Sequence, residues 1–411
     1  MDTRNLTPVK ASERYIVLDA LRGFALSGIA LANFPEFSLF NFLGPEAAEE
    51  VAGAKFDSLT RYLQYVLVDG KFYTIFSLLF GIGFSIILGN ASKKGVNGFR
   101  IFYRRMGVLT LIGFLHLMFI WSGDILMLYA LMGMLLPLFR NISDRGLLKW
   151  AAVLLFMPVL IDAGCELTGT NLSAPIVEAQ QKACARYGIN SDNFAYWLRD
   201  AESYKGTFQF LLQGALVRMQ EFVDGNRYFK VLGLFLIGFH IGRKRIFADL
   251  ESRRNWLRKV FSAGVAVGLP LSLAYAWSAF RHHPWGLAAH SLLYFASVYP
   301  LGFAYMAGIP LLYLKCKNGW LWRMLAAPGR MALTNYIDQS VIGMLLFYGI
   351  GLGFGASIGL FCTECVVAAV FLFQVAFSRI WLHFFQFGPL EWLWRMLTYG
   401  KVFTLVRKRE R

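Results

Sequence analysis

The sequence predicts an all-α, polytopic transmembrane helical bundle of about ten spans, with both termini in the cytoplasm. Of its 411 residues, 57% are hydrophobic and only 16% are charged, whereas a soluble domain carries roughly 25% charged residues. Many apolar runs approach about 20 residues, the length that a helix needs to cross the hydrocarbon core. Lys and Arg gather between alternate runs, as they do in the cytoplasmic loops of membrane proteins. A water-soluble chain of this composition would expose apolar patches large enough to cause aggregation.

The apolar runs divide the chain. We expect one integral-membrane domain over residues 1–411, with an outer loop plus amphipathic segment at 165–227 and a cytoplasmic interfacial tail at 379–411. The second run is long enough to be tilted, or broken near Gly70. The spans are expected near residues 16–34, 59–88, 103–121, 124–139, 147–164, 228–242, 256–280, 285–314, 331–350 and 356–377.

Charge sets the predicted orientation. The formal net charge is +16, yet the segment 35–57 holds Lys55 as its only basic residue. Segments rich in Lys and Arg all fall on one side of a chain with about ten spans, and by the positive-inside rule that side is the cytoplasm. The bilayer therefore explains the basic character, and we expect no nucleic-acid partner. These basic segments are 93–105, 140–149, 243–258, 315–330 and 407–411.

The cysteines leave two interpretations open. Cys165 and Cys184 both fall in the predicted outer loop. In an oxidising compartment they could form a disulfide, and otherwise they are two free thiols. Cys362 and Cys365 sit one helical turn apart inside a span and favour a small-residue packing face.

A polar cluster marks the first span. Asp19 and Arg22 are three residues apart, so they share a helix face and can pair. Arg14 precedes them at the predicted inner interface. Because Arg is a planar clamp for anions, the cluster could bind a phosphate or carboxylate group. The alternative is a structural ion pair that holds the first helix to the bundle.

His116 and Asp124 are the candidate catalytic residues. His116 precedes the short turn between two predicted spans, Asp124 opens the returning helix, and Tyr129 follows further in. Imidazole titrates near neutral pH, so a His with a carboxylate in reach is a candidate general base or proton relay. The alternative is a His that only closes the hairpin. No His, Cys, Asp and Glu spacing in the chain indicates a metal site.

Two further polar segments interrupt the spans. Lys71 follows Asp69 and Gly70 at the predicted break in the second span. Arg330 and Asn335 lie at the unusually polar start of the ninth span, where such side chains can line a cavity or join helices.

Small residues in the second span predict a close helix contact. Ser77, Gly81 and Ser85 recur every four residues and lie on one helix face. Such a face lets the backbone of a neighbouring helix approach closely.

The motifs together resemble the bacterial inner-membrane family of unknown function typified by YeiB. That family is distantly similar to membrane-embedded acyltransferases, which include acetyltransferases of surface sugars and the lysosomal heparan-α-glucosaminide N-acetyltransferase. The shared feature is chiefly the Asp19–Gly23 opening, and this chain has no histidine before the Lys71–Gly83 segment, near where those enzymes place theirs. The motifs that carry the resemblance are Leu18–Ala25, Lys71–Gly83, His116 with Gly123–Leu126 and Tyr129–Ala130, Gly329–Tyr336 and Phe387–Arg395.

The resemblance implies a multi-pass protein of the bacterial inner membrane that transfers an acyl group to an envelope glycan, lipid or small acceptor. Acyl-CoA would be the donor, and His116 with Asp124 would supply the base. A transporter or export component and a non-catalytic assembly partner are the alternatives, and the oligomeric state is left open. The donor- or substrate-binding residues would be Arg14, Asp19, Arg22, Lys71, Tyr129, Arg330 and Asn335.

Overall fold

The computed structural model describes residues 15–93, 95, 97–317 and 319–407 and confirms the all-α class. Within these residues the chain forms helices joined by turns, with isolated β-bridges such as Ala52 to Ile358 but no β-strand. Arg14, one of the predicted binding residues, lies outside the described part of the chain.

Within the described ranges, seven helical segments are long and apolar enough to cross a membrane. One of them, Ala54–Lys93, comprises the 3₁₀ turn η4 (Ala54–Phe56) and the helices α3 (Asp57–Leu67) and α4 (Lys71–Lys93). The others are α1 (Ile16–Phe37), α5 (Gly98–Phe119), α7 (Asp144–Thr168), α12 (Arg254–Phe280), α13 (Gly286–Lys315) and α16 (Leu360–Phe384).

Three shorter helices occupy the remaining predicted spans. The fourth predicted span corresponds to α6 (Leu126–Gly133) followed by η5 (Leu136–Phe139), and the sixth predicted span corresponds to the 17-residue α11 (Arg227–Arg243). The ninth is the 16-residue α15 (Ala332–Phe347), which follows α14 (Trp320–Arg330). These helices are shorter than a typical span, which has about 20 residues.

The predicted break in the second apolar run is confirmed. α3 ends at Leu67, and α4 begins at Lys71 after Gly70, whose φ is +72°. A Cβ at Gly70 would lie 2.5 Å from the Tyr294 hydroxyl, so both the conformation and the space favour glycine.

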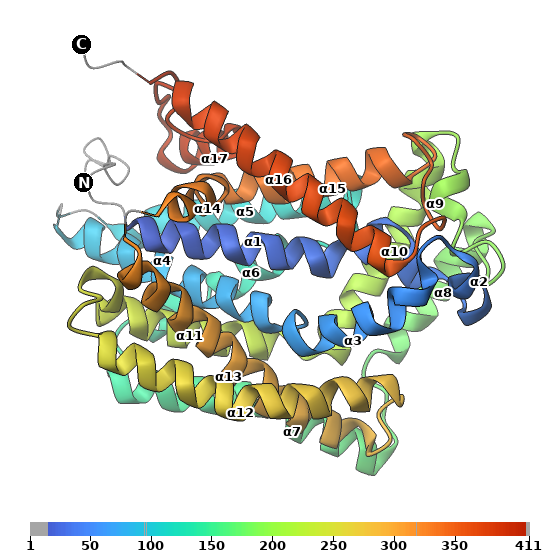
Figure 1. Ribbon diagram of the computed structural model, residues 1–411, viewed down its shortest axis with the longest axis horizontal. Coiled ribbons are helices and arrows are strands. Elements are labelled where there is room, and N and C mark those ends of the chain that lie inside the picture. The colour runs from blue at the N-terminus through green and yellow to red at the C-terminus, as the bar shows by residue number, and fades with distance from the viewer. Residues whose placement is uncertain (1–14, 94, 96, 318, 408–411) are drawn as a thin grey trace.

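The helices run along one another, with α1 between two edges of the bundle (Figure 1). α7, α12 and α13 lie along one edge, and α16 with α17 (Pro389–Tyr399) lie along the opposite edge. α1 packs against α4, α13, α14, α15 and α16, so most of it is covered by other helices.

The two ends of the bundle differ. α1 begins at the end where α17 lies, and we call this the basic end because of the side chains described below (Figure 1). Short helices gather at the opposite end, where α10 (Tyr204–Asp224) also lies (Figure 1). The short helices are α2 (Pro45–Glu50), α8 (Ala174–Tyr187) and α9 (Trp197–Asp200).

Close helix contacts depend on glycine. A Cβ at Gly23 of α1 would lie 1.9 Å from the Leu325 carbonyl oxygen, and one at Gly329 of α14 would lie 1.8 Å from the Asp19 carbonyl oxygen. The predicted contact at Gly81 is also present, because a Cβ there would lie 2.1 Å from the Phe235 carbonyl oxygen of α11.

The thiols of Cys165 and Cys184 are both free in the structure. The Cys184 Sγ instead lies 3.2 Å from the Gln180 side-chain amide and 3.8 Å from the Gln213 Oε1. Of the two interpretations of Cys165 and Cys184, the structure therefore agrees with two free thiols and not with a disulfide.

Candidate functional site

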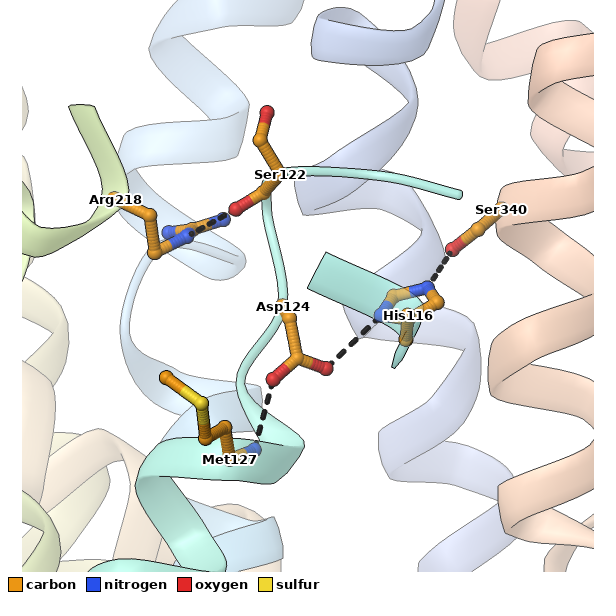
Figure 2. A network of polar contacts seen from close by, with 6 residues as sticks. All are labelled: His116, Ser122, Asp124, Met127, Arg218 and Ser340. Atoms are coloured by element: carbon orange, nitrogen blue, oxygen red, sulfur yellow. Dashed lines mark hydrogen bonds and ion pairs between the residues drawn. The ribbon is translucent and has the colours of Figure 1, made fainter. Parts of the chain in front are cut away.

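His116 lies in the last turn of α5 and is bound at both ring nitrogens. Its Nδ1 is 2.9 Å from the Asp124 Oδ1, and its Nε2 is 2.9 Å from the Ser340 hydroxyl of α15 (Figure 2). The three side chains are buried, with at most 2% of each residue exposed. The predicted pairing of His116 with Asp124 is thus present, and Ser340 extends it.

The turn after α5 holds Asp124 in place. Its second oxygen, Oδ2, accepts a 2.8 Å hydrogen bond from the Met127 backbone N–H in the first turn of α6. In the same turn, the Ser122 carbonyl accepts a 3.1 Å hydrogen bond from the Arg218 Nε of α10 (Figure 2). Each carboxylate oxygen therefore has a fixed partner, and the imidazole orientation follows from it.

This arrangement selects one tautomer of the neutral imidazole. An ionised Asp124 is an acceptor only, so it favours the proton on Nδ1. Nε2 is then the acceptor and takes its hydrogen bond from the Ser340 hydroxyl. A base that is oriented by a carboxylate and reaches a hydroxyl is the arrangement that activates nucleophiles in acyl-transfer enzymes.

Tyr336 connects the His116 site to the interior of the bundle. Its ring centroid lies 5.3 Å from that of His116, and it is one helical turn before Ser340 on the same face of α15. Tyr336 also forms part of the wall of a large cavity.

The cavity has a volume of about 1240 Å³, which exceeds the roughly 300–1,000 Å³ of ordinary small-molecule sites. Its mouth is at the basic end, where the lining residues Lys93, Arg140 and Arg243 are exposed. Its inner wall is mostly apolar and includes Phe76, Leu126 and Tyr336.

The charge of the cavity is strongly one-sided. Asp19 and Glu391 are the acidic residues among the described lining residues. The basic ones are Arg22, Lys93, Arg105, Arg140, Arg243, Arg245, Arg330 and Arg395. A wall with many cations at its mouth and apolar side chains inside fits an amphiphilic anion.

Four of the predicted binding residues line this cavity. Asp19 and Arg22 do, and their side chains pair at 2.6 Å. Tyr129 and Arg330 line it too, and the Tyr129 hydroxyl forms a 2.7 Å hydrogen bond with the Ser77 hydroxyl.

Lys71 and Asn335 lie elsewhere. The fully buried Lys71 ammonium donates to the Tyr65 carbonyl at 2.7 Å and lies 5.3 Å from the Tyr275 ring centroid. The Asn335 amide donates to the Ser378 hydroxyl of α16 at 2.9 Å, so it joins two helices. The structure therefore does not bring these two residues to the cavity, although both were predicted to bind substrate or donor.

Comparison with known proteins assigns the chain to a family. The family described as "Protein of unknown function (DUF418)" matches residues 241–401. The protein printed as "Uncharacterized protein YeiB" of Escherichia coli is 30% identical over 409 residues, which cover 94% of this chain and 96% of that protein. The chain belongs to the DUF418 family.

Two further relatives of this chain come from Bacillus. "Uncharacterized protein YxaH" of Bacillus subtilis is 29% identical over 404 residues, with 96% of each chain covered. The "Uncharacterized 39.9 kDa protein in amylase 3'region" of Bacillus acidopullulyticus is 30% identical over 414 residues, which cover 98% of this chain and 99% of that protein. No solved structure matches the chain.

In this DUF418 protein, the structure joins the Phe387–Arg395 motif to the Gly329–Tyr336 motif. Glu391 of α17 caps the start of α15: its Oε1 accepts from the Leu333 and Thr334 backbone N–H groups at 2.7 and 3.1 Å. Its Oε2 accepts from the Thr334 hydroxyl at 2.6 Å. Burial raises the pKa of the Glu391 carboxyl, and these hydrogen bonds oppose the rise.

Glu391→Gln is expected to destabilise the protein by about 1–3 kcal/mol, because an amide NH₂ would replace one acceptor oxygen and face a donor. Thermal unfolding of the purified protein in detergent measures the effect. Glu178→Gln is the matched control, since Glu178 is exposed and its pair with Lys182 is worth at most about 1 kcal/mol. Equal unfolding temperatures for the two variants would contradict the capping role.

Ser340, Arg218 and Glu391 are residues of these sites that the sequence did not predict. Ser340 lies 224 residues from His116 in the chain, so no local spacing connects them. The only available signal was the polar face of the ninth span, on which Ser340 lies one turn after Tyr336. Within the described ranges, no group of three or more His, Cys, Asp and Glu side chains could hold a metal ion.

Proposed function

We propose that this protein transfers an acyl group from acyl-CoA to a hydroxyl or amine acceptor, such as an envelope glycan or lipid. The observation that carries the proposal is the cavity, whose wall includes basic side chains at its mouth and also Tyr336, the ring of which packs against that of His116. Acyl-CoA is an amphiphilic anion, with phosphates for the basic mouth and an acyl chain for the apolar interior.

The proposed membrane arrangement fits this direction of transfer. It has about ten spans in the inner membrane of a bacterium, with α6, α11 and α15 as the short ones, and both ends in the cytoplasm. The gathering of Lys and Arg at the basic end supports a cytoplasmic assignment for that end. The cavity mouth would then face the compartment that holds acyl-CoA.

His116 is the proposed general base, and Asp124 is its positioning residue. Proton transfer to a positioned base contributes about 10²–10⁴-fold to a rate. Asp124 keeps the proton of the neutral imidazole on Nδ1, so that Nε2 can accept a proton, and it stabilises the imidazolium that forms. Both roles use the hydrogen bonds already described.

Arg22→Gln and Arg245→Gln are each expected to weaken the binding of coenzyme A about tenfold, because a charge-assisted hydrogen bond is worth roughly 1.5–3 kcal/mol. Titration of the purified protein in lipid nanodiscs with coenzyme A and with acetyl-CoA measures the dissociation constants. The binding should also weaken as salt is raised, because the mouth is exposed.

Arg258→Gln is the control for these variants. Arg258 is a basic residue of α12 that is exposed and is not part of the cavity wall, so its loss should leave the dissociation constant unchanged. Wild-type protein that binds neither coenzyme A nor any acyl-CoA would exclude the proposed donor.

Export or transport is a second candidate, because a cluster of charged and polar groups, which includes the fully buried Lys71 and the half-buried Asp69, lies at the break between α3 and α4. Besides Lys71, it holds Asp69, which accepts a 2.6 Å hydrogen bond from the Tyr275 hydroxyl. Buried charges of this kind often mark substrate or proton paths. Flux into sealed vesicles that depends on Lys71, without any release of coenzyme A, would favour this candidate. A non-catalytic assembly role would show neither activity.

A further inference from the structure

Ser340 already occupies the position at which His116 would act as a base. Its hydroxyl lies 2.9 Å from the His116 Nε2, within the 2.6–3.2 Å range of a nucleophile and its general base. An external acceptor would have to displace this hydroxyl before His116 could take the proton of the acceptor.

The Ser340 hydroxyl has the setting of an activated nucleophile. Asp124 fixes the other side of the imidazole at 2.9 Å, so serine, histidine and aspartate form a continuous chain of hydrogen bonds. These residues come from α15, α5 and the turn before α6, and such a constellation is recognised by geometry and not by order in the sequence. A hydroxyl that served only to join helices would not require a carboxylate behind its partner.

The cavity wall comes within one helical turn of Ser340 along α15. Tyr336 lies one turn before Ser340 on α15, lines the cavity, and packs against His116. Ser340 and His116 are not part of the cavity wall, so the acyl group of a bound donor would reach the Ser340 hydroxyl once the Tyr336 ring moves aside.

We propose that Ser340 is a catalytic nucleophile that carries the acyl group as an ester between the donor and the acceptor. The inference rests on the proposed acyl transfer and adds a covalent intermediate to it. The protein would thus work in two half-reactions and would hold the acyl group after coenzyme A has left.

In the first half-reaction, the Ser340 Oγ forms a bond to the acyl carbon of the thioester while its proton moves to the His116 Nε2. The carbon–sulfur bond then breaks, and the leaving thiolate takes that proton and departs as free coenzyme A. In the second half-reaction, the acceptor hydroxyl or amine gives a proton to Nε2 and its heteroatom bonds to the acyl carbon. The ester bond to Ser340 breaks, and the proton returns to Oγ.

An alkyl fluorophosphonate tests the nucleophile without knowledge of the natural donor. The Ser340 Oγ would displace fluoride from phosphorus, and peptide mass spectrometry of the purified protein would find the phosphonate on Ser340. We expect labelling in the wild type, none at this position in Ser340→Ala, and a rate at least about 100-fold lower in His116→Ala. Prior addition of palmitoyl-CoA should slow the labelling.

Ser297→Ala is the matched control. Ser297 is a fully buried serine of α13 whose hydroxyl lies near the Tyr294 carbonyl and not near His116. This variant should be labelled like the wild type. If Ser340→Ala does not fold, Ser340→Cys replaces it: incubation with acetyl-CoA should then leave an acyl thioester that neutral hydroxylamine removes, whereas the wild-type ester persists.

The outcomes separate this inference from the proposed function. Absence of phosphonate on Ser340, or equal labelling rates in the wild type and in His116→Ala, overturns the nucleophile. Release of coenzyme A at the wild-type rate by folded Ser340→Ala overturns it too, but leaves the acyl transfer intact. His116-dependent labelling of Ser340 without any binding of acyl-CoA supports the nucleophile and removes only the proposed donor.

Discussion

Asp124→Asn is expected to lower the rate of fluorophosphonate labelling at Ser340, and the rate of acyl transfer, by about 10³–10⁴-fold. The asparagine amide can donate to the His116 Nδ1, which then carries no proton. The proton moves to Nε2, and the imidazole can no longer accept from the Ser340 hydroxyl. The fold should persist, because the Asn side-chain oxygen can still accept from the Met127 N–H, as asparagine commonly does at the start of a helix.

Asp162→Asn is the control for that variant. Asp162 is also buried, at 5% exposed, and it accepts a 3.0 Å hydrogen bond from the Asn226 amide, but it is not part of the cavity wall and is not a hydrogen-bond partner of His116. Its labelling rate should match that of the wild type. A labelling rate of Asp124→Asn within a few-fold of the wild-type rate would show that Asp124 only holds the α5–α6 turn.

The His116–Asp124 pair could be predicted from the sequence because both residues belong to one short hairpin. A turn between two antiparallel helices brings the end of one close to the start of the next, so a separation of eight residues already implies proximity. Ser340 could not be found in this way, because its position depends on how α15 packs against α5 across 224 residues of chain. Packing between distant helices leaves no periodic signal in one sequence.

The break at Gly70 was predictable for a different reason. Charged residues on both sides of a glycine conflict with a continuous membrane helix, and the structure has α3 and α4 on its two sides. The buried side chain of Lys71, by contrast, was assigned to substrate or donor, and the structure gives it the Tyr65 carbonyl as a partner. The sequence marks a buried charge but does not say which side chain or carbonyl satisfies it.

The short helices show the limit of span prediction by composition. α6, α11 and α15 are apolar, yet each is shorter than a helix of about 20 residues, the length needed to cross the hydrocarbon core. Neighbouring helices bury the middle of α11, where Leu234, Phe235 and Leu236 are 0% exposed. Length and apolar content therefore indicate membrane burial, whereas the number of crossings depends on packing.

The glycines of the first and fourteenth helices connect the fold to the cavity. Gly23 and Gly329 lie in two separate motifs. Because each lacks a side chain, a backbone carbonyl of the other helix can approach it closely. Asp19 and Arg22 of α1 and Arg330 of α14 lie beside this contact, and all three line the cavity. A change in the distance between the two helices would therefore alter both stability and donor binding.

Gly329→Ala is expected to destabilise the protein by about 3 kcal/mol, at the upper end of the cost of overpacking, because the new Cβ would lie 1.8 Å from the Asp19 carbonyl oxygen. A backbone atom cannot rotate away as a side chain can, so α1 and α14 must separate. Thermal unfolding in detergent measures the loss, and coenzyme A titration at a temperature where the variant is folded should show weaker binding. Gly164→Ala in α7 is the opposite control: a Cβ there meets nothing within 4 Å, so the helix should gain roughly 0.5–1 kcal/mol. An unfolding temperature of Gly329→Ala at or above that of the wild type would mean that the α1–α14 contact does not hold the basic end together.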